Sequence, residues 1–225
     1  MITDKEKLRK NRILSEHIRS KFPASRHSIV MRRPVFGFGI NDADYVTMPK
    51  IGNNLVRCPA YRSWHNMIRR TCDKNFQAIN ESYRDANVCD EWISFMAYRG
   101  WWLKNQVDNW DLDKDILRAD SKIYSPSTCV FVPRWLNGII GDCRKRRGSW
   151  PIGVSWHKRD QIFQAHCKNP FTGKAEGLGY FRCPKLAHEA WKKHKLSFVK
   201  AAKKEMDAID HRIYDNVVSI IKRSQ

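Results

Sequence analysis

The feature that most constrains the fold lies near the end of the chain. Three short segments, 153–158, 162–168 and 177–181, are predicted to be strands, and a turn with Pro170 and Gly173 separates the last two, which is typical of a small sheet. The segment after Pro184 instead places apolar or aromatic residues at intervals of three or four: Ala187, Trp191, His194, Phe198, Ala202 and Met206. This spacing predicts a long helix that covers one face of the sheet. Within the stripe, His194 is predicted to be a packed residue and not a ligand.

A second pattern, between residues 110 and 140, predicts strand, turn, strand and helix. The strands are expected at 112–117 and 129–132, with a polar turn at 118–122 and a helix that begins near Pro133. A ββα unit of this kind folds back on itself, so Asp113 on the first strand can face Asn137 on the helix. Asp113, Asp115 and Asn137 offer the oxygen ligands that one hard divalent cation prefers, such as Mg²⁺ or Mn²⁺. A solvated acidic turn is the alternative.

The preceding part of the chain is predicted to be mainly helical. Apolar residues at helical spacing favour helices at 4–21 and 61–70, the first of which could also be a mobile arm. A third helix is predicted over 90–100, with Asp90 as its N-cap and Gly100 as its stop. Glycines alternating with aromatic residues predict a short strand that enters a turn within 34–45.

The charge is segregated along the 225 residues. The chain carries a net charge of +19 and has a pI near 9.9, which favours a nucleic-acid partner over a membrane surface. Residues 1–36 hold ten Lys and Arg against three Asp and Glu, 37–137 hold thirteen against twelve, and 138–225 hold nineteen against eight. The nearly neutral middle therefore contains the acidic cluster, and the ends are expected to contact phosphates.

A glycine-rich basic run after Asn137 predicts a linker over 141–151. Four successive basic residues within it are expected to follow a phosphate backbone: Arg144, Lys145, Arg146 and Arg147. A solvated basic loop that leaves DNA affinity unchanged is the alternative.

The seven cysteines show no C-x₂-C spacing, so reduced thiols in the cytoplasm are expected. Zinc binding by Cys167, Cys183, His166 and His188 is a weaker alternative, because their spacing resembles no common finger. The chain shows neither an apolar signal core nor a run long enough to span a membrane. It is therefore predicted to stay in the cytoplasm of the cell that makes it.

At these motifs the sequence resembles the HNH homing endonucleases of bacteriophages, in the group with a C-terminal AP2-like DNA-binding domain. The resemblance runs from about Val35 to Met206 and depends on the order and spacing of several pieces. These are Gly37 to Tyr45, Tyr61-x₂-Trp64-x₂-Met67 with Arg70-Thr-Cys72, Val88-Cys89-x₂-Trp92-x₂-Phe95, Leu112-Asp-Lys-Asp-Ile-Leu117, and Tyr124-Ser-Pro-x-Thr-Cys-x-Phe-Val-Pro133 with Asn137.

The resemblance implies an α+β protein, in which a central ββα-metal (HNH-like) nuclease domain is followed by an AP2-like domain of three strands and a helix. The predicted parts are a basic arm or helix (1–34), the nuclease domain (35–140), the basic linker (141–151), the AP2-like domain (152–210) and a tail (211–225). The host would be a bacterial cell.

The resemblance also assigns roles. Asp113 falls on the position of a metal ligand and Asn137 on the final helix position, with Lys114 where many relatives have a histidine base and Thr128 where the middle Asn would lie. Carboxylates beside Lys114 favour its charged form, so we expect it to hold a phosphate and not to accept a proton. Water could then be activated by Asp115, by His65 or by the metal itself.

By the same likeness, the open face of the AP2-like sheet would enter the major groove of DNA, which accepts a β-ribbon. The residues at the matching positions are Ser155, His157, Lys158, Arg159, His166 and Lys168.

These patterns lead to three hypotheses. The first is a site-specific, homing-type endonuclease that acts as a monomer on double-stranded DNA and hydrolyses phosphodiester bonds with one divalent ion. The second is a catalytically degenerate DNA-binding regulator, which the missing histidine and middle asparagine favour. The third, an RNA-binding protein, leaves the acidic cluster without a role.

Overall fold

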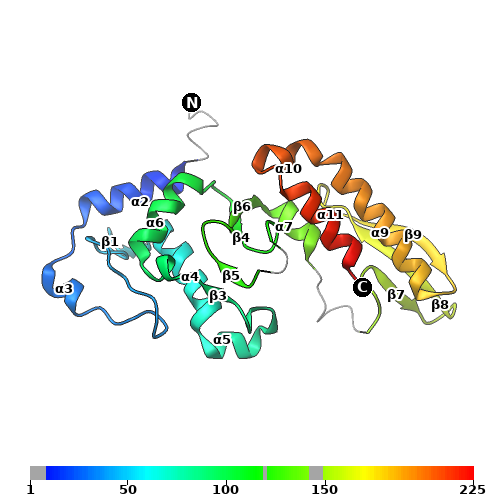
Figure 1. The fold of residues 1–225 in the computed structure, drawn as a ribbon, viewed down its shortest axis with the longest axis horizontal. Coiled ribbons are helices and arrows are strands. Elements are labelled where there is room, and N and C mark those ends of the chain that lie inside the picture. Colours follow the sequence, from blue (N-terminus) through cyan, green and yellow to red (C-terminus); the bar gives the residue numbers. More distant parts are fainter. Residues whose placement is uncertain (1–8, 119–120, 142–148) are drawn as a thin grey trace. The chain divides into compact units, whose positions relative to one another are not determined.

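A computed structural model describes residues 9–118, 121–141 and 149–225 (Figure 1). The described chain is a mixed α+β protein, as predicted, and divides into two compact units. The first comprises the described residues within Met1–Asp115 and Asp120–Phe131, and the second those within Ile116–Ala119 and Val132–Gln225. Among the described helices, none combines the length and the apolar character that a membrane span requires.

The first unit is mainly helical and contains three small two-stranded sheets, β1-β2, β3-β5 and β4-β6. Its elements are α2 (Lys10–Lys21), α3 (Arg26–Val30), β1 (Lys50–Ile51), β2 (Asn54–Leu55), α4 (Pro59–Cys72), α5 (Lys74–Ile79), η1 (Glu81–Tyr83), β3 (Asn87–Val88), η2 (Asp90–Ile93), α6 (Phe95–Asn105), β4 (Trp110–Asp113), β5 (Ile123–Tyr124) and the first half of β6 (Val130–Pro133).

Buried aromatic rings hold this unit together where α4 packs against α6 and α2. Trp64, at the centre of α4, is fully buried, lies 5.5 Å from the ring of Phe95 and donates its indole N–H to the Trp92 carbonyl at 2.8 Å. The predicted helix at 61–70 is confirmed, and Trp64, Met67 and Ile68 form its buried face. The helix predicted near the N-terminus is confirmed over Lys10–Lys21.

The strand predicted within 34–45 is wrong. Val35 and Gly39 pair with each other across a tight turn, in which Phe36 and Gly37 have positive φ angles of 51° and 80°. The chain bends here to pass over Trp64. A Cβ atom at Gly39 would lie 2.8 Å from the Trp64 ring, so the close approach requires glycine at this position.

The third predicted helix begins later than expected. Asp90 starts the 3₁₀ turn η2, whereas the N-cap of α6 is Ser94, whose hydroxyl accepts the Ala97 N–H at 3.1 Å. Gly100 lies inside α6 and does not end it. The start is fixed from outside the segment, because Asp42 accepts hydrogen bonds from the Ser94 hydroxyl at 2.6 Å and from the Met96 N–H at 2.9 Å.

In the region 110–140 the two predicted strands and the helix are confirmed, but the short strand β5 lies between the two strands and pairs with β3. The first strand, β4, is shorter than predicted and ends at Asp113, while Ile116 and Leu117 are buried residues of the second unit. β4 pairs with β6, and β6 leads without a break into α7 (Arg134–Ile140).

The second unit contains a three-stranded antiparallel sheet, in the order β7-β8-β9, and one helix, α9, packs against it (Figure 1). Its strands confirm the prediction: β7 (Val154–His157), β8 (Ile162–Lys168) and β9 (Ala175–Phe181). The helices that follow are α9 (Pro184–Ala201), α10 (Lys203–Ile209) and α11 (Ile213–Arg223).

The helix after Pro184 covers the sheet as predicted, but its buried stripe differs in two places. Ala187, Trp191, Ala202 and Met206 are buried as expected, whereas Lys195 is buried in place of His194 and Val199 in place of Phe198. His194 is half-buried and lies 2.7 Å from the Glu176 carboxylate. The helix ends at Ala201, so Met206 belongs to α10.

Residues 211–225, predicted as a tail, contain α11. Ile213, Val217 and Ile221 recur along one face of this helix and are buried where it packs against α9. Both ring nitrogens of the buried His188 lie near backbone carbonyls, Nδ1 at 2.8 Å from Ile152 and Nε2 at 3.0 Å from Ser224. The end of the chain is therefore part of the core of the second unit.

Candidate functional site

Asp113, the predicted metal ligand, lies at the end of β4 and is 8% exposed. Its Oδ1 accepts the Asp115 backbone N–H at 2.8 Å, which fixes the orientation of the carboxylate. The pKa of the neighbouring Cys129 thiol is raised to about 12, mainly by burial and in part by the negative charge of Asp113. Asp113 is therefore held in one orientation in a place of low solvent access.

Asn137, the second predicted ligand, is half-buried in the middle of α7. It belongs to the second unit and Asp113 to the first, so their meeting on one ion stays a prediction.

Lys114 does not have the surroundings expected of a phosphate contact. Its side chain is 4% exposed, its ammonium group lies 2.5 Å from the Asp115 carboxylate, and it sits 5.8 Å from the centre of the Tyr124 ring. A buried cation that is paired in this way stabilises the turn after β4. This burial argues against the predicted contact between Lys114 and a phosphate.

Thr128, at the position of the middle Asn of the motif, forms hydrogen bonds within its own loop. Its hydroxyl donates to the Ile123 carbonyl at 2.6 Å and accepts the Ser125 N–H at 3.1 Å. The side chain is 4% exposed, so these bonds hold the loop between β5 and β6. They give no support to a catalytic part for Thr128.

His65, one of the candidate bases, lies on α4 between aromatic rings. Its ring centre is 5.1 Å from that of Phe36 and 5.9 Å from that of Tyr61. Burial, and then the nearby cations Arg57 and Arg69, lower the pKa of His65. The neutral form is therefore favoured, and this is the form that can accept a proton.

The donor chemistry at the end of β4 fits a hard cation in part. Asp113 carries a carboxylate and Asn137 a carboxamide, and each offers an oxygen of the kind that Mg²⁺ accepts beside several waters. Asp115 fits less well, because the Lys114 ammonium already neutralises its carboxylate. Within the described ranges, no cluster of three or more His, Cys, Asp or Glu residues could hold a metal by itself. An ion would thus need oxygen ligands from water or from a phosphate.

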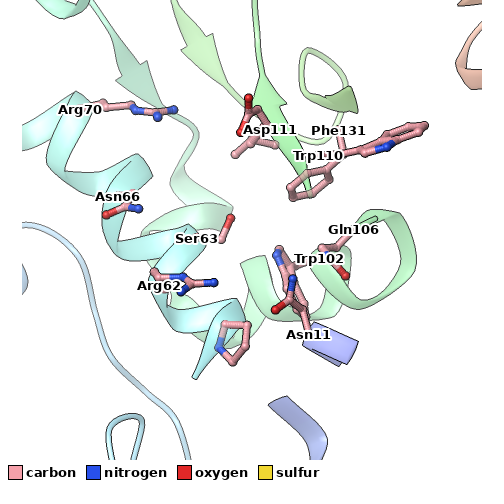
Figure 2. A pocket seen from close by; sticks show the side chains of 12 residues that line it. Asn11, Arg62, Ser63, Asn66, Arg70, Trp102, Gln106, Trp110, Asp111 and Phe131 are labelled. Carbon is pink, nitrogen blue, oxygen red and sulfur yellow. The ribbon is translucent and has the colours of Figure 1, made fainter. Parts of the chain in front are cut away.

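A polar cavity of about 210 Å³ opens beside β4 within the first unit (Figure 2). Arg62, Asn66 and Arg70 line it from α4, and Asp111 lines it from β4. Figure 2 shows the three α4 side chains on the face of the helix that looks toward β4. The remaining walls are formed by Asn11, Pro59, Ser63, Trp102, Gln106, Trp110, Leu112 and Phe131.

The cavity carries positive charge beside one carboxylate. Burial by itself lowers the pKa of the Arg70 guanidinium, but neighbouring phenols and the Asp111 carboxylate more than offset this effect and raise the pKa. Arg70 therefore stays charged, and its guanidinium carbon lies 5.5 Å from the centre of the Tyr83 ring. The sequence indicates a phosphate contact for the polar face of the 61–70 helix, which includes Arg62 and Arg70, but it does not single out Asp111. The alignment of the two arginines with a strand some forty residues away could be seen only in the fold.

The open face of the sheet in the second unit brings together most of the predicted DNA contacts. Burial alternates along β8, where Ala165 and Cys167 are buried and His166 and Lys168 are exposed. Ser155 pairs with Gln164, and His157 pairs with Ile162, so these residues share the face of His166 and Lys168.

Two residues that the sequence reasoning missed lie in the middle of this face. Gln164 is paired on one side with Ser155 and on the other with Tyr180, which is 56% exposed. Strand alternation and the pairing of β8 with β9 were the signals that could have found them. Amide and phenol groups in this row can donate and accept hydrogen bonds at base edges.

Cations at the end of β7 extend this face. Lys158 and Arg159 follow the strand in an exposed turn, and the Arg159 side chain is 92% exposed. His157 Nδ1 lies 3.2 Å from the Asp160 carboxylate. The four successive basic residues predicted to follow a phosphate backbone, Arg144, Lys145, Arg146 and Arg147, lie outside the described residues.

The zinc alternative gains no support from the sheet. His166 and Cys167 are neighbours on β8 and therefore point to opposite faces, His166 toward solvent and Cys167 toward α9. Burial raises the pKa of the Cys167 thiol, which disfavours the thiolate that zinc binds.

Comparison of the chain with protein-family models, with curated proteins and with solved structures gave no match. The functional argument therefore depends on the residues and their geometry.

Proposed function

We propose that this protein is a metal-dependent DNA endonuclease, in which the sheet of the second unit binds duplex DNA and the ββα segment cleaves it. The observation that carries the proposal is the order at residues 110–140. A strand ends at the buried carboxylate of Asp113, pairs with β6, and β6 continues into the helix that bears Asn137.

The charge distribution supports a nucleic-acid partner. The chain has a net charge of +19, and the open face of β7–β9 exposes His166, Lys168 and Tyr180. Hydrogen-bonding groups flanked by cations suit contact with base edges and phosphates together.

Asp113 and Asn137 are the residues that would hold the ion. A bound divalent cation lowers the pKa of its water and stabilises charge on the phosphate. The Asp115 N–H keeps the Asp113 carboxylate in one orientation, and the ion pair of Lys114 with Asp115 holds the turn that follows. Water could be activated by Asp115, by His65 or by the ion itself, which are the three candidates that the sequence offers.

The second candidate is a DNA-binding regulator that does not cleave. One observation favours it: Lys114 stands at the position of the usual histidine base and is buried in an ion pair. Binding of RNA by the same basic surfaces is the weaker alternative.

The deciding experiment compares cleavage and binding in the Asp113→Ala variant. Purified protein is incubated with long duplex DNA and Mg²⁺, and cleavage is followed on gels while binding is measured by anisotropy. We expect Asp113→Ala to lose at least about a hundredfold in cleavage rate and to keep its affinity. Asp85→Ala, which removes an exposed carboxylate in the same unit, serves as the control.

Binding without cleavage by the wild-type protein, across Mg²⁺, Mn²⁺ and Ca²⁺, would favour the regulator. Equal cleavage by the wild type and the Asp113→Ala variant would remove Asp113 from the site. Tighter binding of duplex RNA than of duplex DNA in competition would favour the RNA-binding alternative.

A further inference from the structure

The covered face of the sheet in the second unit extends beyond the helix that covers it. In the β7–β8 register Val154 pairs with Ala165, and both are buried under α9. Two positions nearer the turn that joins these strands, Trp156 pairs with Phe163, so both rings point to the same face as Val154. The two rings are only half-buried. The aromatic side chains at this end of the sheet therefore retain surface that α9 does not cover.

A cavity of about 500 Å³, which we call the aromatic cavity, lies at this end of the sheet. Three rings line it, those of Trp150, Trp156 and Phe163, together with the charged side chains of Asp160 and Arg182. The helix α9, which the structure describes over its whole length, contributes no residue to its walls. The volume is within the roughly 300–1,000 Å³ of pockets that hold small organic ligands.

The three rings of the aromatic cavity contact one another. The ring centre of Phe163 is 4.9 Å from that of Trp150 and 4.7 Å from that of Trp156, and the planes are inclined by 76° and 60°. The two indoles are 6.4 Å apart and inclined by only 32°. Trp150 is nevertheless 36% exposed. Indole rings of this kind offer flat apolar surface on which an aromatic heterocycle such as a nucleobase stacks.

Charge distinguishes between the ligands that indole rings attract. Such rings also bind ammonium and guanidinium groups, which the Asp160 carboxylate would favour. This carboxylate is already engaged, because His157 Nδ1 lies 3.2 Å and Arg159 Nε 3.8 Å from it. Arg182 lines the cavity, and Lys158 precedes Arg159 in the same exposed turn. The positive charges around the cavity outnumber the negative one, which favours an aromatic ligand that is itself an anion.

We propose that the aromatic cavity binds one unstacked base of a DNA strand. The base lies against the rings of Trp150 and Trp156, and the basic side chains around the cavity attract the phosphates of the strand. The base must be unstacked, because neighbouring bases cover both of its faces in a duplex. The site accepts every base, since the rings bind a π face and not a hydrogen-bonding edge.

The place of the aromatic cavity relates it to the open face of the same sheet. His157 and Tyr180, whose ring centres are 5.9 Å apart, stand on the open face at this end of the sheet. The turn after His157 leads directly to Asp160, which lines the cavity. A duplex on the open face that is opened at this end would place a base within reach of the cavity. The choice of DNA, and this role, rest on the proposed endonuclease function.

The test uses the full-length protein without divalent metal, so that no cleavage occurs. Two fluorescent strands of about six units are compared by anisotropy. One carries thymine at every position, and the other consists of abasic sugar-phosphate units with the same charge. We expect the wild type to bind the thymine strand about tenfold more tightly, which is the effect of one stacked base.

Substitutions at Trp150 test the rings. Trp150→Leu keeps an apolar side chain but removes the π face, so we expect the preference for the thymine strand to fall to about twofold or less. Trp150→Phe, which keeps a ring, should retain most of it. Phe171→Ala is the control, because Phe171 is a 52% exposed ring in the turn between β8 and β9, at the opposite end of the sheet. Thermal unfolding of each variant checks that it folds.

A substitution at Arg182 tests the charge. We expect Arg182→Gln to weaken the binding of both strands by a similar factor, and to reduce the slope of log affinity against log salt by roughly 0.7. The preference for the thymine strand should remain. Lys204→Gln, which removes an exposed charge from α10, is the matched control and should weaken the binding of either strand less.

Three results would overturn the proposal. An unchanged preference in Trp150→Leu would place the stacked base elsewhere. Competition by tetramethylammonium chloride beyond that of sodium chloride at the same concentration, lost in Trp150→Leu, would make the cavity a site for cations. Tighter binding of a uracil ribonucleotide strand than of a uracil deoxyribonucleotide strand, again lost in Trp150→Leu, would replace DNA by RNA.

The two proposals fail separately. A protein that prefers the thymine strand through Trp150 but never cleaves DNA keeps the base site and loses the endonuclease. A protein that cleaves through Asp113 but binds the thymine and abasic strands equally keeps the endonuclease and loses the base site.

Discussion

The two units of this protein present polar groups in different ways. In the first unit, Arg62, Arg70 and Asp111 meet in a recess between a helix and a short strand, beside a core of packed aromatic rings. In the second unit, Gln164, His166 and Lys168 stand in the open on one face of a regular sheet. A recess encloses one small group, whereas an open face can follow an extended surface.

The difference separates the features that local sequence pattern predicts from those that depend on tertiary packing. The open face follows from the alternation of side chains along each strand, so neighbours in sequence predict it. The recess depends on the approach of α4 and β4, which are separated by about forty residues and held by Trp64, Trp92 and Phe95. Four predictions test this comparison, from the largest expected effect to the smallest.

Trp64→Ala should break the first unit. It removes a fully buried ring and the bond to the Trp92 carbonyl, so we expect the unfolding free energy of this unit to fall by about 3–5 kcal/mol. Native-state hydrogen exchange resolves the loss in α4 and α6. Trp64→Phe, which keeps a ring, should lose less. Unchanged protection of α4 in Trp64→Ala would show that the ring core does not hold the recess.

Gly153→Ala should destabilise the second unit. Gly153 has a φ of +78°, and a Cβ there would lie 2.1 Å from Trp191 Cδ1, so we expect a loss of roughly 2–4 kcal/mol in the protection of β7 and β8. Gly177→Ala is the control, since no atom lies within 4 Å of a Cβ at that position of β9. Equal protection in the two variants would contradict the packing described.

Asp210→Asn should weaken the junction of α10 and α11 by about 1 kcal/mol at neutral pH. Asp210 accepts from the Arg212 backbone at 2.9 Å and from its guanidinium at 2.8 and 2.7 Å, and the pKa of Asp210 falls to about 2, mainly through Arg212.

A depressed pKa sets the sign of the pH dependence. The stabilisation by Asp210 is fully present above about pH 4 and is lost as the pH falls toward 2. Thermal unfolding should therefore separate the wild type from Asp210→Asn at pH 7 and bring them together near pH 2. Asp207→Asn, which removes a more exposed ion pair on α10, should change little at either pH.

Lys168→Gln should have the smallest effect, on binding alone. We expect duplex DNA affinity to fall roughly twofold to fivefold and the slope of log affinity against log salt to decrease by about one. Lys204→Gln, an equal loss of charge on α10, is the control. Equal effects of the two variants would mean that net charge, and not the open face, governs binding.

Much of the fold could be predicted from the sequence. The strands β7 to β9, the helix after Pro184 and the helix at 61–70 follow from periodicities that packing then preserved. The failures share one cause, which is contact with a distant segment. Trp64 bends the chain at Gly39, and Asp42 moves the start of α6 to Ser94.

The residues of the candidate site likewise divide into those that the sequence predicts and those that only the fold brings together. Sequence pattern alone placed Asp113 on a strand and Asn137 on the helix that follows, because each depends on residues a few positions apart. The structure ended the strand at Asp113, and the pairing of β7 with β8 put Ser155 and His157 on the face of His166 and Lys168. Only the tertiary structure decided that Lys114 is buried in an ion pair and that Arg62, Arg70, Gln106 and Asp111 line one cavity. The sequence specifies the charge and the hydrogen-bonding groups of each side chain. Whether that side chain contacts solvent, a partner or a cavity depends on which segments pack beside it.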